Sequence, residues 1–299
     1  MTIEDIFRTA RQECKHLYPE PEINAMVRLL LHHYTNLTPT QLYTEPNCQL
    51  SIVNSQLMID ALHQLAAGRP LQYITGKTEF CGLTFEVNEQ VLIPRPETEE
   101  LVQWAVEELK TYPTPVVLDL CTGSGCIAVT VAKKCPTAKV LACDISTGAL
   151  ATAQRNAAIN EAAVDFFYHD VLETRNKDIK NKDNSQFSTL NSQLITHNSS
   201  IIILSNPPYV RNSEKAMMRK NVLDYEPHAA LFVDDEDPLI FYRTIAAIAR
   251  QCITADGFVM IEINETMAVA TMQLFRDAGF SSVTLRQDIN GKDRIVMAQ

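Results

Sequence analysis

The chain has 299 residues, of which 46% are apolar and 21% charged, the composition of an ordinary globular protein with a sizeable core. Its net charge is −10 and it has no cluster of Lys and Arg. This balance argues against nucleic acid as the main partner, without excluding a local basic patch. The length predicts about two domains.

Eight cysteines are dispersed along the chain, and none forms a Cys-x-x-Cys pair, so a zinc site is not expected. Several stand in apolar, strand-like surroundings, where a free cysteine behaves as a small hydrophobic residue. No apolar run approaches the roughly 20 residues of a membrane span, and no signal peptide is evident. We therefore expect a cytoplasmic protein with reduced cysteines, no membrane segment and no metal.

Residues 2–68 predict helices, because apolar side chains recur at helical spacing in three stretches that begin at Ile3, Ile23 and Ile59. Between Thr78 and Val87 the period falls to two, which indicates a short hairpin. The chain therefore begins with a helical region and continues into a hairpin.

The domain boundary is expected near this hairpin. The predicted organisation is a small all-α N-terminal domain at 1–75, a hairpin and linker at 76–95, and a larger domain at 96–299. Pro94 and Pro96 precede a helix that opens the larger domain, since proline is tolerated in the first turn but not further inside a helix.

In the larger domain, predicted strands and helices alternate, which indicates βαβ units and a parallel sheet with helices on both faces. Two late strands are separated by only a few residues and predict an antiparallel hairpin at the sheet edge. A mostly parallel, seven-stranded sheet with this ending favours a Rossmann-like class I methyltransferase fold over a dehydrogenase half. The predicted strands are Val116–Leu120, Lys139–Asp144, Val164–Tyr168, Ile201–Ser205, Phe258–Ile263, Ser281–Arg286 and Arg294–Ala298, with helices near 126–134, 146–160 and 239–251.

Residues 174–200 interrupt this alternation. They are rich in Asn, Ser, Lys and Gln and contain only scattered apolar residues. We predict a solvated, flexible insertion, because such a segment buries too little apolar surface to fold. A partner-binding loop is the alternative.

The turn from Asp119 to Cys126 contains two glycines, Gly123 and Gly125, which let the backbone approach a ligand closely. The following helix supplies free N–H groups at its N-terminus, and Asp144, at the end of the next strand, is placed to bind both hydroxyls of a ribose. This pattern suits S-adenosylmethionine, but it also satisfies the fingerprint for NAD. The acid before the glycines and the lack of a general acid for a carbonyl substrate favour the former. A tight turn without a ligand is the third interpretation.

Two residues after the strand Val164–Tyr168 are further candidates for the cofactor site. Asp170 can accept a hydrogen bond from an adenine amino group, and Val171 can line the adenine face. Asp170 is equally suited to cap a helix or a turn, so both interpretations stand.

Asn206-Pro207-Pro208-Tyr209 follows the apolar strand Ile201–Ser205. Proline lacks an N–H and has a fixed φ, so the turn is stiff and its carbonyls are free to accept hydrogen bonds. The oxygens of the Asn206 side chain and the Pro207 carbonyl can accept both N–H groups of a planar –NH₂. Tyr209 offers a flat wall or, alternatively, fills the core. Beside a methyl donor, this arrangement indicates methylation of a weakly nucleophilic planar nitrogen.

Longer motifs follow one another along the chain: Pro70–Gly76, Glu79–Leu83, Leu92–Glu99, Leu118–Val129, Asp144–Ser146, Asn206–Tyr209 and Asp224–Leu231. Through them, nearly the whole chain resembles the HemK/PrmC family of glutamine methyltransferases, which modify peptide chain release factors. The Asn-Pro-Pro-Tyr motif alone is shared with DNA amino-methyltransferases, so a DNA or RNA amino-methyltransferase is the alternative. The segment Pro94–Glu99 and the helical N-terminal region favour the protein substrate.

The resemblance implies roles for individual residues. S-adenosylmethionine, which leaves as S-adenosylhomocysteine, would be held by Cys121, Thr122, Gly123, Ser124, Gly125, Asp144, Asp170, Val171 and Asn206. A substrate glutamine in a Gly-Gly-Gln motif would be held by Asn206, Pro207, Pro208 and Tyr209, with Asn206, Pro207 and Tyr209 as the catalytic residues. The helical domain would dock the release factor, and we expect a monomer without direct binding of nucleic acid.

The chain departs from the family pattern in several ways: the 174–200 insertion is longer than usual, the strand before Asn206 lacks an Asp that is common there, and three residues differ. Cys121 stands where glycine is frequent, Val171 where an aromatic residue is common, and Asn264 where glycine is common. None of the three lies in the Asn-Pro-Pro-Tyr motif, so the resemblance implies the same activity.

Overall fold

The computed structural model describes residues 1–173 and 200–299. These residues form two compact units, one of Met1–Lys77 with Arg219–Tyr225, and one of the remaining chain from Thr78. The predicted insertion at 174–200 lies, apart from Ser200, outside the described residues. The segment Arg219–Tyr225 groups with the first unit although it is distant from it in the sequence, which the sequence analysis did not predict.

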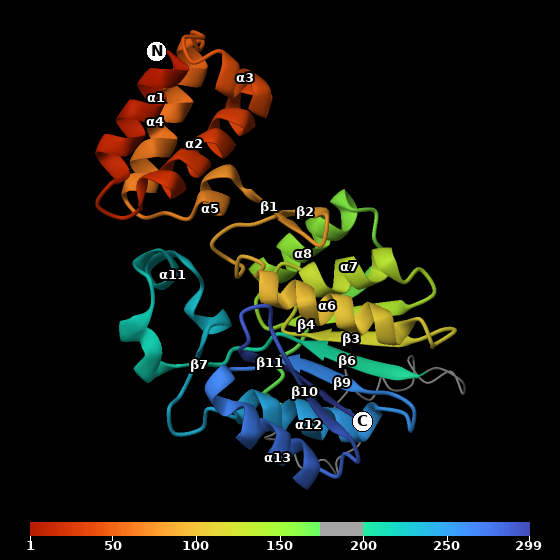
Figure 1. Ribbon diagram of the computed structural model, residues 1–299. Helices are drawn as coiled ribbons and strands as arrows, with labels where there is room; N and C mark the ends of the chain where they lie inside the picture. The colour runs from red at the N-terminus through yellow and green to blue at the C-terminus, as the bar shows by residue number, and fades with distance from the viewer. Residues whose placement is uncertain (174–199) are drawn as a thin grey trace. The chain divides into compact units, whose positions relative to one another are not determined.

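The first unit contains a helical bundle (Figure 1) of α1 (Ile3–Cys14), α2 (Glu20–Thr35), α3 (Pro39–Thr44), α4 (Ile52–Ala66) and α5 (Leu71–Thr75). The short helix α11 (Lys220–Tyr225) is grouped with this unit. Its core is built from the apolar faces of α1, α2 and α4, with Ile6, Leu30 and Leu62 fully buried. A capping box starts α1, because the Thr2 hydroxyl accepts from the Asp5 N–H and the Asp5 carboxylate accepts from the Thr2 N–H. The helices predicted between residues 2 and 68 are confirmed.

A seven-stranded sheet forms the centre of the second unit, from β3 (Val116–Leu120), β4 (Lys139–Asp144), β5 (Val164–Tyr168), β6 (Ile201–Ser205), β9 (Val259–Glu262), β10 (Val283–Gln287) and β11 (Asp293–Ala298). The strand order is β10-β11-β9-β6-β3-β4-β5. Strands from β9 to β5 run parallel, whereas β11 is antiparallel to β9 and β10. The predicted fold class, with its antiparallel hairpin, is confirmed.

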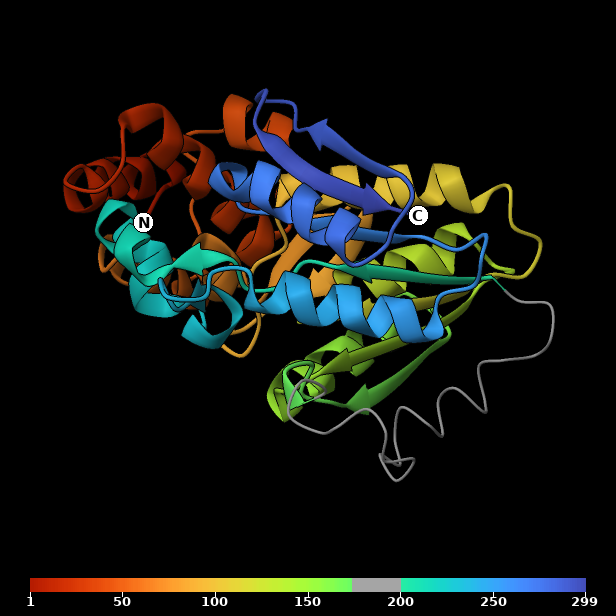
Figure 2. The same ribbon diagram turned by 90° about the horizontal axis from the view of Figure 1, so that it is seen from below.

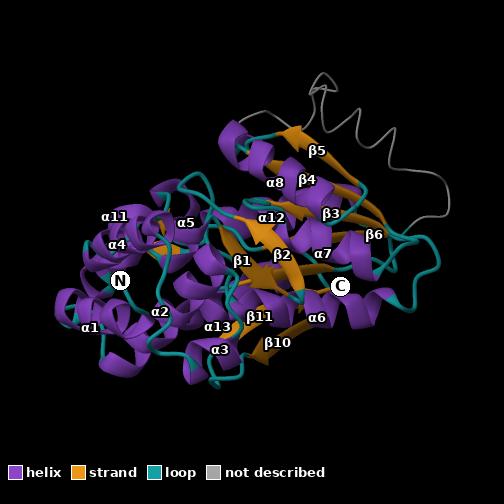
Figure 3. Cartoon of the chain, turned by 90° about the horizontal axis from the view of Figure 1, so that it is seen from above, coloured by secondary structure: helices purple, strands orange, loops and turns teal. Residues whose placement is uncertain are grey.

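Helices cover both faces of the sheet. On one face lie α6 (Pro96–Leu109), α7 (Cys126–Lys134) and α8 (Thr147–Ile159), as Figures 1 and 3 show. On the other lie α12 (Ile240–Cys252) and α13 (Ala268–Asp277), side by side in Figure 2. Successive strand residues alternate between these layers: Val117 packs with α6 and α7, and Leu118 packs with α12.

The helix α13 was not predicted from the sequence. Its buried face consists of Ala268, Thr271 and Phe275, of which only Phe275 is strongly apolar. Val269 is 82% exposed, so an apolar residue also stands on the solvent side. Because apolar residues stand on both sides of α13, its sequence lacks the helical spacing of apolar residues on which a helix prediction depends.

Short elements complete the unit. β1 (Lys77–Phe80) and β2 (Leu83–Glu86) form the predicted hairpin, while β7 (Val210–Arg211) and β8 (Phe232–Val233) form a small parallel sheet too short to give a sequence signal. Short 3-10 helices occur at Asn212–Met217, His228–Ala230 and Glu265–Met267. Within the two described ranges, no helix combines the length and apolarity needed to cross a membrane.

Candidate active site

A cavity of about 450 Å³ lies in the second unit, where the carboxyl ends of the parallel strands meet. Its walls include most of the residues that the sequence predicted for cofactor and substrate: Cys121, Thr122, Gly123, Ser124, Asp144, Asp170, Val171, Asn206 and Pro208. Of the other candidates, Gly125, Pro207 and Tyr209 adjoin lining residues without lining the cavity themselves. One pocket therefore collects candidates from the ends of β3, β4, β5 and β6.

The two glycines of the turn after β3 have different surroundings. Both have a positive φ, 55° at Gly123 and 81° at Gly125, which a residue with a Cβ rarely adopts. A Cβ on Gly123 would meet no atom within 4 Å, whereas a Cβ on Gly125 would lie 3.0 Å from Cβ of Ala153 on α8. Gly123 thus leaves open space beside the cavity, and Gly125 permits the close approach of α8.

Cys121 has a left-handed conformation with a φ of 61°. This explains why glycine suits the position, since a Cβ there is strained. Burial is the largest cause that raises the pKa of the Cys121 thiol, with the Asp144 carboxylate as a second cause. The thiol is therefore protonated and unreactive at neutral pH.

The carboxylate of Asp144 at the end of β4 is oriented by two backbone N–H groups. Oδ2 accepts from Gly123 N at 2.8 Å, and Oδ1 accepts from Ser146 N at 2.8 Å. Burial raises the pKa of Asp144, while these N–H groups act in the opposite direction. A carboxylate held in this way, facing the cavity, can accept two hydrogen bonds from a diol.

Asp119 on β3 lies beneath the glycine turn and is fully buried. Its Oδ2 accepts from the Thr122 hydroxyl at 2.6 Å and from Ala128 N at 3.2 Å, so it joins the turn to the start of α7. Within residues 1–173 and 200–299, its Oδ1 has no hydrogen-bond partner. Burial raises the pKa of Asp119 to about 7, opposed by the bonds from Thr122 and Ala128.

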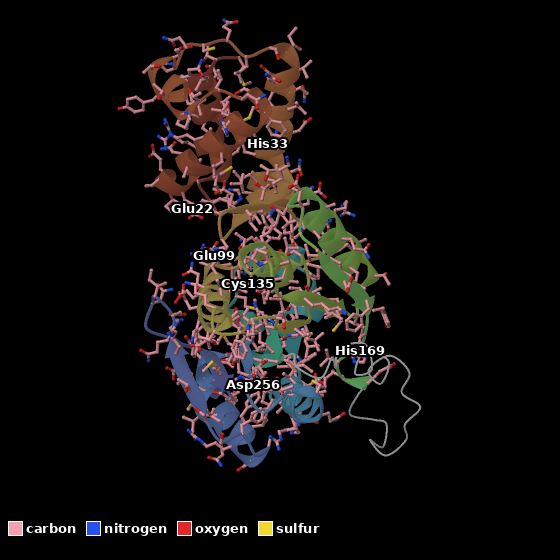
Figure 4. All side chains as sticks on the ribbon, turned by 90° about the vertical axis from the view of Figure 1, so that its right-hand side faces the viewer. Glu22, His33, Glu99, Cys135, His169 and Asp256 are labelled. Carbon is pink, nitrogen blue, oxygen red and sulfur yellow. The ribbon has the colours of Figure 1, made fainter. Side chains whose placement is uncertain are left out.

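The segment after β5 borders the cavity with His169, Asp170 and Val171. Asp170 Oδ1 accepts from Leu172 N at 2.8 Å, as expected for a turn cap, and Asp170 also faces the cavity, so both interpretations of this residue persist. Val171 is 4% exposed and joins the apolar core. His169, labelled in Figure 4, was missed by sequence reasoning, although its place at the end of a predicted strand was a signal.

Asn206 is joined to a buried hydrogen-bond network. Its Nδ2 donates to the Thr98 hydroxyl at 3.0 Å, and this hydroxyl donates to Oε2 of Glu262 at 2.6 Å. The Tyr209 hydroxyl donates to the other oxygen of Glu262 at 2.9 Å. Sequence reasoning missed Thr98 and Glu262, although Thr98 lies in the Leu92–Glu99 motif and Glu262 lies near the end of a predicted strand.

Tyr209 is partly buried, and its ring packs against the core between the sheet and α12. Burial is the largest cause that raises its pKa, with the Glu262 carboxylate as a second cause. The phenol is therefore neutral and serves as a donor to Glu262. The role of this ring as a flat wall for a substrate stays a prediction.

The segment Leu92–Glu99 is also tied to the segment that contains Pro227, Ala229 and Ala230, three residues of the cavity wall. Arg95 donates to Oε1 of Glu226 at 2.6 Å, and Ile93 N donates to Oε2 at 3.3 Å. The Glu226 side chain is 1% exposed and that of Arg95 is 31% exposed. This ion pair was not predicted.

The cavity has room and a hydrogen-bonding group for a nucleoside. The open space at Gly123 leaves room for the ligand, and the oriented carboxylate of Asp144 can hold its ribose hydroxyls. The volume lies within the range of about 300–1,000 Å³ that is usual for small-molecule sites. In the described part of the chain, no group of three or more His, Cys, Asp or Glu side chains is arranged to bind a metal.

Comparison with known proteins shows the family of the chain. The methyltransferase small domain matches residues 102–225, and the PrmC N-terminal domain matches residues 5–76. A release factor glutamine methyltransferase of Flavobacterium psychrophilum is 40% identical over 288 residues, covering 95% of this chain and 94% of that protein. One of Bacteroides thetaiotaomicron is 38% identical and covers 96% of each chain. The solved delta-N METTL16 MTase domain, 16% identical, covers 78% of this chain and 94% of its own with a TM-score of 0.51, and it supports the fold alone.

Proposed function

We propose that this chain, which belongs to the release factor glutamine methyltransferase family, methylates the side-chain amide nitrogen of a glutamine in peptide chain release factors. The methyl donor of the class is S-adenosylmethionine. The observation that carries the proposal is that Asn206 shares one cavity wall with Gly123 and Asp144. Asn206, which is proposed to hold the substrate amide, thus lines the same cavity as Gly123 and Asp144, which are proposed to hold the nucleoside.

When bound, S-adenosylmethionine supplies a methyl group on a positively charged sulfur and becomes S-adenosylhomocysteine. Asp144 would hold the ribose hydroxyls, and the turn from Cys121 to Gly125 would surround the rest of the nucleoside. Asp170 and Val171 are proposed to border the adenine.

The substrate amide would be held by the Asn-Pro-Pro-Tyr turn. Because Asn206 Nδ2 is engaged with Thr98, its Oδ1 is available to accept one N–H of the glutamine amide. The carbonyl of Pro207 would accept the second N–H, and Pro208, which lines the cavity, would bound the site together with its neighbour Tyr209. Both bonds increase the electron density of the nitrogen and fix its orientation, so positioning and electrostatics supply most of the catalysis. The proton leaves the methylated amide for solvent after transfer, and no strong base is needed.

The glutamine is proposed to lie in a Gly-Gly-Gln motif, with the helical unit as the docking domain for the release factor. We further propose that the enzyme acts as a monomer in the cytoplasm, where release factors work. Its eight cysteines are unpaired, which fits a reducing compartment.

A nucleic-acid amino-methyltransferase is the rival function, and the cavity disfavours it. The charged side chains among the described lining residues are Glu89, Arg95, Asp144 and Asp170, with His169 as a further titratable group. A phosphate backbone would require a basic surface, and this lining is acidic on balance. A nicotinamide enzyme is tested separately by comparing the thermal stabilisation given by S-adenosylmethionine and by NAD.

The deciding experiment is mass spectrometry of a purified release factor after incubation with the enzyme and isotope-labelled S-adenosylmethionine. We expect one added methyl group on the glutamine of the Gly-Gly-Gln motif. Asn206→Ala should retain cofactor affinity within about tenfold and lose turnover by about 10²-fold, as for a lost oriented hydrogen bond at a reacting group. Methylation of nucleic acid instead of the release factor, or normal turnover by Asn206→Ala, would refute the assignment.

A further inference from the structure

Three side chains from distant parts of the sequence form one hydrogen-bonded chain that ends at the substrate side of the cavity. Thr98 lies in the first turn of α6, Glu262 ends β9, and Asn206 follows β6. The contacts run from Asn206 Nδ2 to Thr98 Oγ1 at 3.0 Å and from Thr98 Oγ1 to Glu262 Oε2 at 2.6 Å. Parallel strands β6 and β9 are neighbours, which brings the two strand ends together.

The inner part of this chain is shielded from water. Thr98 is 2% exposed and Glu262 is 1% exposed, whereas Asn206 is partly exposed at the cavity wall. Both oxygens of the Glu262 carboxylate are engaged, one by Thr98 and the other by the Tyr209 hydroxyl at 2.9 Å. A buried group with this many fixed partners has little freedom to rearrange.

The direction of each bond follows from what the groups can donate. Burial raises the pKa of Glu262, whereas the hydrogen bonds from Thr98 and Tyr209 oppose this and favour the ionised form. The ionised carboxylate only accepts, so the single proton of the Thr98 hydroxyl points to Glu262. The lone pairs of the Thr98 oxygen then remain for a donor, and the –NH₂ of Asn206 is that donor. The two ends of an asparagine amide have nearly the same shape, so the hydrogen-bond network decides which end faces outward.

We propose that Thr98 and Glu262 are positioning residues that hold the Asn206 amide with its nitrogen inward and its oxygen toward the nitrogen of the substrate. This inference rests on the proposed function for the identity of the substrate amide. In the opposite orientation, the –NH₂ of Asn206 would face the –NH₂ of the substrate, and two donors cannot pair. The network therefore selects the one orientation in which Asn206 can hold the glutamine nitrogen.

Substitutions at Thr98 separate the hydroxyl from the volume of the side chain. Thr98→Ser keeps the hydroxyl and should retain turnover within about threefold, whereas Thr98→Val keeps the shape and should lower kcat about 10²-fold, the size of effect expected from a misplaced reacting group. The dissociation constant for S-adenosylmethionine, measured by calorimetry, should stay within about tenfold in both, because Thr98 borders the cavity but the contacts at Asp144 and Gly123 are unchanged. Thr271→Val is the matched control, since Thr271 is fully buried and its hydroxyl has no partner among the described residues.

Glu262→Gln tests the direction of the network. The new amide can donate to Thr98, which frees the Thr98 proton to point to Asn206 and reverses the preferred orientation of its amide. We expect kcat to fall about 10²-fold with the cofactor dissociation constant unchanged. If Thr98→Val fails to fold, Glu262→Gln decides the proposal alone.

A second readout does not depend on turnover. In ¹⁵N-labelled protein, the side-chain amide signal of Asn206, identified by its loss in Asn206→Asp, reports how fast its protons exchange with water. These protons should exchange slowly in the wild type and in Thr98→Ser, and faster in Thr98→Val and Glu262→Gln, where they no longer bond to Thr98. The same spectra can be recorded if the wild type fails to methylate a release factor, so failure of the proposed function is distinguishable from failure of the network.

Each result for the Thr98 and Glu262 variants either supports or overturns the positioning role. A loss of kcat and of proton protection in Thr98→Val and Glu262→Gln, with both retained in Thr98→Ser and Thr271→Val, supports the positioning role. Equal kcat values for Thr98→Val and Thr98→Ser overturn it. Unchanged exchange of the Asn206 amide protons in Thr98→Val and Glu262→Gln overturns it as well.

Discussion

Oδ2 of Asp144 lies 2.8 Å from the backbone nitrogen of Gly123, which donates a hydrogen bond to it. The glycine turn after β3 and the acid after β4 are thus joined directly, and no ligand is needed to bring them together. The carboxylate is already oriented toward the cavity, and the turn is fixed by the same bond. Such preorganisation lowers the cost of ordering the site when a ligand binds.

Asp144→Ala should weaken binding of S-adenosylmethionine by at least about tenfold, because a charge-assisted hydrogen bond contributes roughly 1.5–3 kcal/mol. The variant also leaves Gly123 N and Ser146 N without their acceptor, so the turn loses its support. Calorimetric titration measures the affinity, with Asp165→Ala as the control, since Asp165 is an exposed residue on β5. An unchanged dissociation constant would remove Asp144 from the cofactor site.

Gly125→Ala should mainly lower the free energy of unfolding, whereas Gly123→Ala should mainly lower the affinity for the cofactor. Alanine at Gly125 would lie 3.0 Å from Cβ of Ala153, so we expect a loss of about 2 kcal/mol or more in the free energy of unfolding. Alanine at Gly123 meets no atom within 4 Å and should cost about 1 kcal/mol through its φ of 55°, while its methyl group enters the ligand space and lowers cofactor affinity. Urea unfolding and calorimetry, carried out on both variants, separate the two effects. A similar stability loss in both would contradict the packing argument.

The sequence predicted the sheet and the cofactor turn because each depends on local patterns. The strand β6 begins with four consecutive apolar residues, β3 is apolar except for Asp119, and Gly123, Gly125 and Asp144 stand at fixed distances along the chain. The pairing of Thr98 with Glu262 spans 164 residues, and it follows from the order of strands and not from any local spacing. Buried polar networks of this kind become evident only when the elements that carry them are placed in three dimensions.

The buried Asp119 should make stability depend on pH. Burial raises its pKa from 3.8 to about 7, so the folded state holds the proton more tightly than the unfolded chain does. Its contribution to stability is therefore largest below about pH 4 and is lost as the pH rises to about 7. Asp119→Asn cannot ionise, so the unfolding free energy of the variant minus that of the wild type should increase with pH over this window by about 1–4 kcal/mol.

Urea unfolding of both proteins at several pH values between about 4 and 8 measures this difference. Asp144 ionises near Asp119, but it is present in both proteins, so its direct titration largely cancels. If the unfolding free energy of Asp119→Asn minus that of the wild type stays constant with pH, then Asp119 is ionised in the folded state throughout, contrary to the raised pKa.

The ion pair between Arg95, in the cavity wall, and the buried Glu226 should contribute strongly to the free energy of unfolding. Glu226 is 1% exposed and also accepts from Ile93 N, so Arg95→Ala leaves a buried carboxylate without its main partner. We expect a loss of about 2–3 kcal/mol in the unfolding free energy, reduced from the fully buried case because Arg95 is 31% exposed. Glu226→Gln keeps an acceptor for only one of the two donors and turns its –NH₂ toward the other, so it should lose about 1–3 kcal/mol. The double variant should be less destabilised than the sum of the two, because without Arg95 the neutral glutamine is easier to bury than the carboxylate.

Arg155→Ala is the matched control for this pair. Arg155 and Glu86 lie 2.9 Å apart, but their side chains are 51% and 38% exposed, so the loss should stay below about 1 kcal/mol. The cofactor dissociation constant provides a second measurement, because Arg95 lies in the cavity wall and Glu226 is followed by Pro227, which also lines it. Arg95→Ala should therefore weaken cofactor binding, whereas Arg155→Ala should not. Equal destabilisation by Arg95→Ala and Arg155→Ala would mean that water screens Arg95–Glu226 as effectively as an exposed pair, and the burial of Glu226 would then contribute nothing to the strength of the contact.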